Sequence, residues 1–167
     1  EDHVPLLTER FADAGWDTLG AVGSSALEAG MGLSRGFDTY DDLGPQPPGG
    51  MVIRDGKEVS QRALALVDAQ ADPGRDLLLF AHYYDPHMPW FTAPPELVAR
   101  FARPTYEGPV DGSMQSVGWL TQHWLAGTLP FGQARHARAL YLAQVAWADQ
   151  QLGALLDGLR QRGRLDD

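Results

Sequence analysis

The sequence predicts an α/β fold of three layers (α/β/α), in which helices cover both faces of a mostly parallel sheet. Two short apolar runs, at residues 18–23 and 77–81, have the length and flanks of buried strands. Helical patterns alternate with these runs along the chain, which is typical of a parallel sheet covered by helices. With 167 residues, of which 44% are hydrophobic, the chain is large enough for one domain with a core.

The helices are predicted from apolar residues that recur three and four positions apart. The first is expected to end at Gly15 and the last at Gly163, because glycine commonly closes a helix. The short third helix opens with proline in its first turn, where the missing N–H is tolerated. The four predicted helices are residues 4–14, 59–71, 94–101 and 133–162.

The segments between these elements are predicted to be irregular. Residues 24–50 are expected to form a loop that closes in a surface stretch dense in glycine and proline at 44–50. Residues 54–57 are expected to form an exposed turn. Residues 103–131 contain several glycines and two tryptophans and show no clear period, so they are also assigned to a loop.

Composition narrows the classes of function. The 13 basic and 22 acidic residues give a net charge of −9, which argues against a nucleic-acid-binding surface. Cysteine is absent, so disulfides and thiolate metal sites are excluded within these residues. No apolar run approaches the ~18 residues of a membrane span. The chain starts without methionine and ends directly after a helical pattern, so residues 1–167 are expected to be an internal part of one larger catalytic domain.

The run from His82 to Trp90 is the strongest candidate for a functional site. It follows the predicted strand 77–81, and its two prolines stop both a ladder and a helix. Two histidines, an aspartate and aromatic rings therefore fall on a turn after a strand. Because ligands of open α/β sheets bind at the carboxyl ends of the strands, this turn is predicted to line an active site.

Four segments, in this order, resemble the type I sulfatases of the alkaline-phosphatase-like superfamily. Residues 6–18 are similar to the family's helix running into aGYxT, and residues 32–42 to its GFDxYD segment. Residues 80–90 are similar to its DPHxP turn, and residues 140–166 to its long helix with the ending GllDd. The resemblance implies a sulfatase-like fold for the chain as a partial domain.

The resemblance also implies roles for residues of the turn. His87 matches the family histidine that hydrogen-bonds the sulfate ester and serves in catalysis, and Asp85 and Trp90 of the same turn are assigned with it to substrate binding. An imidazole suits this role because sulfate oxygens need donors and the departing alcohol needs a proton. The implied partner is a small-molecule or glycan sulfate ester. Many bacterial relatives are exported, but no targeting segment fixes a compartment for this chain.

Other family parts have no match in these residues. The formylglycine nucleophile and the ligands of a divalent cation, calcium in this family, are expected outside the chain, so residues 1–167 alone are expected to be inactive and to ligate no metal. The family's GKWHLG motif is replaced by residues 21–27, and Lys57 is a poor substitute for its lysine. This departure leaves the substrate open.

Two alternative functions stay open at this stage. One is a phosphoryl-transfer relative, such as a phosphate or phosphonate monoester hydrolase or a phosphoethanolamine transferase. The other is a non-catalytic relative that keeps the scaffold. Within the run, a packing role is favoured for His82. A metal site of two histidines and one carboxylate, formed by His82, Asp85 and His87, is disfavoured. The neighbouring aromatic rings either pack against the protein or contact the substrate. Trp119, His123 and Trp124 are further substrate candidates without a fixed orientation.

Overall fold

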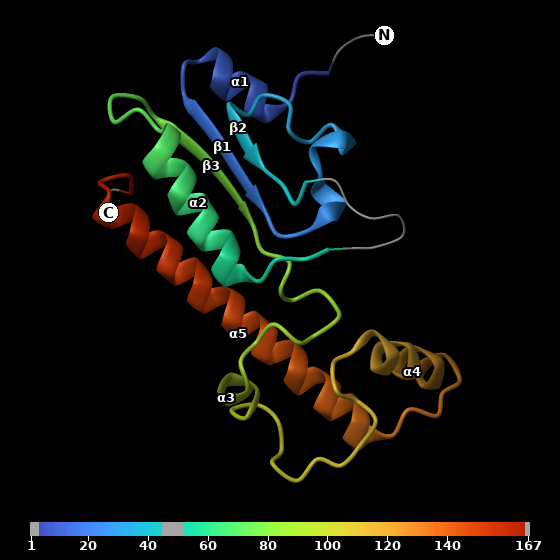
Figure 1. Cartoon of the computed structure of the whole chain (residues 1–167). Helices are drawn as coiled ribbons and strands as arrows, with labels where there is room; N and C mark the ends of the chain where they lie inside the picture. Colours follow the sequence, from blue (N-terminus) through green and yellow to red (C-terminus); the bar gives the residue numbers. More distant parts are fainter. Residues whose placement is uncertain (1–3, 45–51, 166–167) are drawn as a thin grey trace. The chain divides into compact units, whose positions relative to one another are not determined.

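A computed structural model describes residues 4–44 and 52–165, which form two compact units (Figure 1). Unit 1 consists of Glu1–Tyr84 and Gln151–Asp167, and unit 2 is Asp85–Gln150. The last helix, α5 (Phe131–Gln161), contributes its first part to unit 2 and its final turns to unit 1. The predicted stretch at 44–50 lies, except for Gly44, outside the described residues.

Unit 1 is built on a parallel sheet of three strands in the order β2-β1-β3. The strands are β1 (Asp17–Val22), β2 (Thr39–Asp41) and β3 (Leu77–His82). β1 pairs with β3 along its whole length, from Asp17 opposite Leu77 to Val22 opposite His82. All three strands therefore present their carboxyl ends at the same edge.

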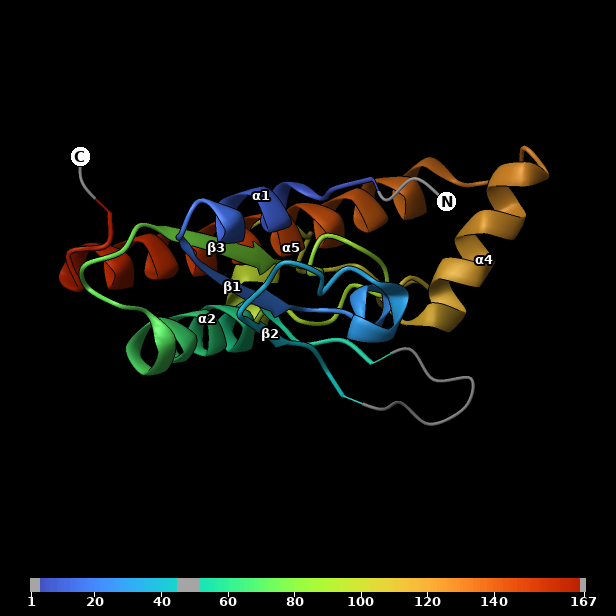
Figure 2. The same cartoon turned by 90° about the horizontal axis from the view of Figure 1, so that it is seen from above.

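Helices lie on both faces of β1, so the predicted α/β architecture with a parallel sheet is confirmed. On one face, Leu19 and Ala21 form a buried cluster with side chains of α2 (Gly56–Gln70) and of the end of α5. On the other face, a Cβ at Gly20 would approach the Tyr40 ring to 2.6 Å. Aromatic rings fill that space, beside α1 (Leu7–Asp13), and Figure 2 shows β1 between α1 and α2.

The predicted strands and helices of unit 1 are confirmed with shifted ends, but the loop assigned to residues 24–50 is wrong in part. It contains two short 3-10 helices, η1 (Ser25–Leu27) and η2 (Ala29–Met31), and the strand β2. A strand of three residues is too short to show a period of two. In β2, the Tyr40 ring lies over Gly20 of the neighbouring strand, a contact that a local pattern in the sequence does not show. The first helix also begins later than predicted, at Leu7.

Unit 2 is helical. It contains α3 (Pro95–Val98), α4 (Met114–Leu125) and the first part of α5, which pack around two small buried clusters. Gln144 of α5 is fully buried, and its Oε1 accepts hydrogen bonds from the Ala93 N–H, at 3.1 Å, and from the Thr92 hydroxyl. These bonds tie the segment after the turn at residues 85–90 to α5.

The assignment of residues 103–131 to a loop is wrong because α4 lies within it. Ser113 caps this helix by accepting a hydrogen bond from the Ser116 N–H at 3.2 Å. Gly118 and exposed Trp124 obscure its amphipathic pattern in the sequence. Among the described residues, no helix combines the length and the apolar character that crossing a membrane would require.

Candidate functional site

The three parallel strands of unit 1 end at a common carboxyl edge. A Cβ at Gly23, directly after β1, would approach the His82 carbonyl oxygen to 2.8 Å, so only glycine allows the chain after β1 to pass so close to β3. Ser24 follows and is fully buried. The carboxyl edge of the sheet is therefore closely packed at β1 and β3.

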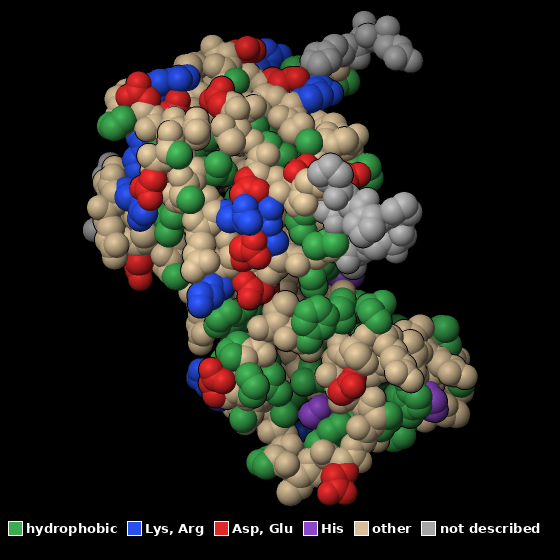
Figure 3. Space-filling model, viewed as in Figure 1, with side chains coloured by type: hydrophobic (Ala, Val, Ile, Leu, Met, Phe, Trp, Pro, Cys, Tyr) green, Lys and Arg blue, Asp and Glu red, His purple; other side chains and the backbone are tan. Residues whose placement is uncertain are grey.

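Arg54 is buried at this edge, and α2 begins at Gly56, which is also buried. The predicted exposed turn at residues 54–57 is therefore wrong, although Lys57 itself is exposed. The Arg54 guanidinium donates hydrogen bonds to the Val22 carbonyl, to Asp41 Oδ1 at 2.9 Å and to the Asp42 carbonyl. It joins the ends of β1 and β2 and so is fixed by the protein itself. Figure 3 shows basic side chains lying beside acidic ones across unit 1 on the face in view.

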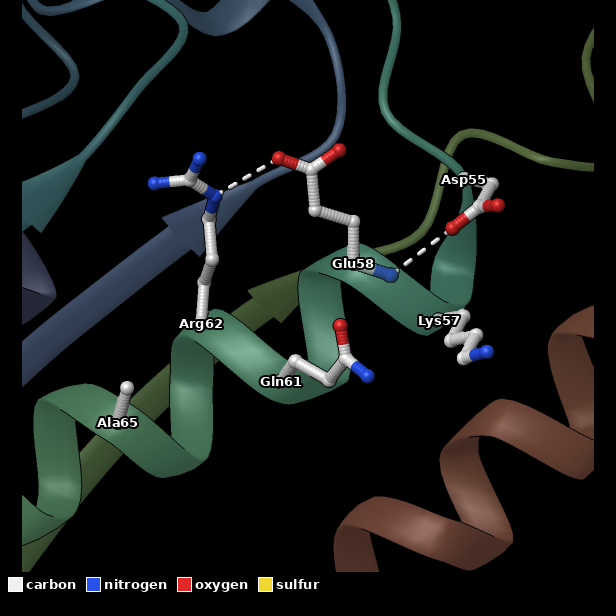
Figure 4. A pocket seen from close by; sticks show the side chains of 6 residues that line it. All are labelled: Asp55, Lys57, Glu58, Gln61, Arg62 and Ala65. Atoms are coloured by element: carbon white, nitrogen blue, oxygen red, sulfur yellow. Dashed lines mark hydrogen bonds and ion pairs between the residues drawn. The ribbon is translucent and has the colours of Figure 1, made fainter.

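Lys57 follows in the first turn of α2 and is exposed. The surface hollow beside it is lined by α2 residues, and Figure 4 shows Arg62 paired with Glu58 and the Asp55 carboxylate capping the helix at the Glu58 N–H. Two of the charged side chains that line the hollow, Arg62 and Glu58, thus form an ion pair with each other. Lys57 is not tied into that pair.

His82 ends β3 with its ring in an aromatic environment. The Phe80 and Tyr84 rings lie 6.4 and 6.1 Å from it, centroid to centroid. Its Nδ1 has no hydrogen-bond partner among the described residues, and burial lowers the pKa of the ring. These surroundings favour a neutral, packed imidazole.

The turn that carries His87 belongs to unit 2 and is braced from two sides. The Trp90 N–H donates to the Gly112 carbonyl at 2.8 Å, and the Trp90 indole N–H donates back across the turn to the Pro86 carbonyl at 3.3 Å. Gly112 has a φ of +88°, and a Cβ there would overlap the Trp90 carbonyl oxygen. Glycine is therefore required where the turn is anchored.

His87 lies exposed at the middle of this turn, between two prolines. Its Nδ1 is 2.6 Å from the Met88 carbonyl oxygen. Because a carbonyl oxygen only accepts hydrogen bonds, this contact places a hydrogen on Nδ1. The turn thus fixes the orientation of an imidazole that reaches the surface.

The two other predicted site residues are built into the same turn. The side chain of Asp85 is buried, 3% exposed, at the start of the turn. Trp90 is partly buried against the cluster around Val110 and Leu140, and its ring meets that of Tyr141 edge-on at 6.4 Å. The structure therefore places Asp85, His87 and Trp90 on one braced turn, while contact of any of them with a substrate stays a prediction.

Residues 119–124, which the sequence left without orientation, lie on α4. The Trp119 and His123 rings stack at 3.9 Å, and His123 Nδ1 is 2.9 Å from the Trp119 carbonyl oxygen. Trp124 is 74% exposed. Stacking therefore occupies two of the three side chains.

The described residues do not fit a divalent cation. No three histidine, aspartate or glutamate side chains among residues 4–44 and 52–165 are grouped so that they could hold a metal ion. No such group is formed by His82, Asp85 and His87, the alternative metal site.

A comparison of the sequence with models of protein families matches nearly the whole chain. The family model described as Sulfatase matches residues 6–167, which include both strands β1 and β3, the His87 turn and α5. The search of curated proteins gives no match. Because the family match covers nearly the entire chain, this chain belongs to the sulfatase family.

Proposed function

We propose that this chain is the middle part of the catalytic domain of a sulfuric ester hydrolase, in which His87 acts on the ester. Membership of the sulfatase family supports a hydrolase of this general kind. The observation that carries the finer proposal is the His87 ring, exposed on a braced turn with its Nδ1–H held by the Met88 carbonyl.

This geometry suits an acid that serves a departing alcohol. With Nδ1 held, a protonated ring donates from Nε2 to an oxygen of the sulfate ester. As the sulfur–oxygen bond breaks, charge develops on the alcohol oxygen, and the same N–H can deliver its proton there. The loss of a proton leaves a neutral ring that is still held in place through Nδ1.

The rest of the turn supports this role. Asp85 is buried, so we assign it to positioning the turn. The Trp90 indole N–H is directed at the Pro86 carbonyl, which leaves the ring surface as the part that would contact the alcohol portion of a substrate.

The nucleophile and the cation are assigned to sequence outside residues 1–167. No segment of the chain matches the formylglycine motif, and the described residues hold no fitting set of metal ligands. By family resemblance we propose a formylglycine and a divalent cation, calcium, in the full-length enzyme. The cation would supply Lewis-acid stabilisation of sulfate oxygens.

The proposal is tested by comparing esters of one alcohol. Full-length protein, supplied with calcium, is assayed with the nitrophenyl esters of sulfate, phosphate and a phosphonate. We expect the largest kcat/KM for the sulfate and its loss on chelation. A preference for phosphate or phosphonate would replace the proposal with a phosphoryl-transfer enzyme, and no turnover of any ester would indicate a non-catalytic scaffold.

A further inference from the structure

A second hollow lies entirely within unit 2, at the amino-terminal end of α5. It has a volume of about 240 Å³ and is formed by the segment after α3 and the first turns of α5. Two arginines, a histidine and a tyrosine supply most of its chemistry. The side chains that matter here are Arg103, Tyr106, Glu107, Arg135 and His136.

The lining of this hollow includes two rings that are stacked on each other. The rings of Tyr106 and His136 stack face to face, with centroids 3.5 Å apart and planes 4° apart. The Tyr106 hydroxyl donates to Gln133 Oε1 and accepts a hydrogen bond from the Val110 N–H at 3.1 Å. Both functions of the hydroxyl are thus used within the protein, and the Tyr106 ring is held against the His136 ring.

The arginines of unit 2 differ from those of unit 1. In unit 1, most arginines form ion pairs, such as Arg54 with Asp41 at 2.9 Å and Arg162 with Asp68 at 2.6 Å. Within the described part of the chain, no ion pair or hydrogen bond engages the guanidinium groups of unit 2, which are those of Arg100, Arg103, Arg135 and Arg138.

Two of these uncommitted guanidinium groups line the hollow, opposed there by one carboxylate, that of Glu107. The local charge is therefore positive on a chain whose net charge is −9. Guanidinium groups bind carboxylate, sulfate and phosphate oxygens through paired hydrogen bonds. A positively charged hollow whose lining includes a stacked aromatic pair matches a ligand that joins an oxoanion to a ring.

We propose that this hollow is a binding site for a small ring-bearing oxoanion, a sulfonate, sulfate ester or carboxylate, separate from the His87 turn. Arg103 and Arg135 bind the anionic group, and the ring lies against the stacked Tyr106–His136 pair. The size agrees, since a cavity of about 150 Å³ already accommodates benzene and this one is larger. The site would give the protein affinity for anionic aromatic or sugar compounds independently of hydrolysis.

His136 gives the site a pH dependence. Burial lowers the pKa of this imidazole, so the free site holds a neutral ring. The groups around it are Tyr106, Glu107, Arg103 and Arg135. A bound anion favours the protonated ring, so binding takes up a proton and becomes tighter as the pH falls.

The test is an NMR titration of the chain with benzenesulfonate, which hydrolysis cannot remove, and with benzoate and neutral benzyl alcohol. We expect the two anions to shift the His136 ring signals and benzyl alcohol to leave them in place. Arg135→Gln should weaken benzenesulfonate binding by about tenfold or more, because it removes a charged hydrogen-bond donor. His136→Phe keeps the stack and should abolish the pH dependence.

Arg138→Gln is the matched control, because it removes an arginine of the same helix that does not line this hollow. It should bind as the unaltered chain does. Equal affinities for Arg135→Gln and Arg138→Gln, equal binding of benzyl alcohol, or no shift at His136 would each overturn the proposal. Binding that disappears in His87→Ala would also overturn it, since the anion would then occupy the turn; that outcome would leave the proposed function standing.

Discussion

At the scale of single residues, Gly112 decides whether the His87 turn can form. Its φ of +88° favours glycine, and its carbonyl accepts the Trp90 N–H that anchors the turn. We expect Gly112→Ala to destabilise the protein by about 1–3 kcal/mol or more, from backbone strain and the lost anchor. Chemical denaturation measures this change.

Gly118→Ala is the control for that substitution. Gly118 lies inside α4, where an added Cβ meets nothing within 4 Å. It should stabilise the helix by up to about 1 kcal/mol, because alanine favours helix more than glycine does. If both substitutions had the same effect, Gly112 would not be the anchor described here.

His82 gives the stability of the protein a pH dependence of predictable sign. Burial lowers its pKa in the folded state, so the unfolded chain binds the proton more readily. The free energy of unfolding should therefore fall as the pH drops below the unfolded value of about 6.5, until the folded ring also protonates. His82→Phe should flatten this dependence in pH-resolved thermal unfolding.

Burial also lowers the pKa of His136. This residue therefore accounts for part of the dependence of unfolding free energy on pH that remains. The His82→Phe protein should therefore retain some dependence, and the double variant with His136→Phe should lose more. An unchanged slope after His82→Phe would show that the ring is hydrated in the folded state.

At the scale of elements, Arg54 connects the ends of the neighbouring strands β1 and β2. It donates to the carbonyl of Val22, the last residue of β1, and to the Asp41 carboxylate of β2, and it is only 8% exposed. We expect Arg54→Met to cost about 2–3 kcal/mol, because it leaves buried acceptors without a donor.

Arg62→Met provides the comparison. Arg62 also pairs with Asp41, at 3.2 Å, but its side chain is exposed. Exposed ion pairs contribute about 0–1 kcal/mol, so this variant should unfold almost as the unaltered protein does. A loss as large as that of Arg54→Met would mean that charge alone, and not burial, stabilises the end of β2.

At the scale of the whole molecule, the long periodic elements and the turn were predictable from the sequence. The apolar runs of β1 and β3, the helix α5 and its closing Gly163, at φ +62°, all follow from local patterns. β2 and α4 were missed for different reasons. The strand depends on a tertiary contact between Tyr40 and Gly20, and glycine and exposed apolar side chains conceal the period of the helix.

The candidate site was likewise predictable from the sequence only where it depends on local patterns. The residue types and prolines of the DPHMP run predicted a histidine on a turn after a strand, and the structure has one, which is exposed. The anchor at Gly112 and the buried Arg54 were not predictable, because each depends on a partner more than ten positions away in the chain. Local patterns do not contain such pairings.

The most direct test of the proposed function is the dependence of turnover on the leaving alcohol. Full-length protein and its His87→Ala variant are assayed with sulfate esters whose alcohols range from nitrophenol to a simple sugar. If His87 protonates the departing oxygen, the loss in kcat/KM should be small for nitrophenol and rise to about 10²–10⁴-fold for the most basic alcohol. A loss of the same factor for every ester, or no loss at all, would contradict the role assigned to His87.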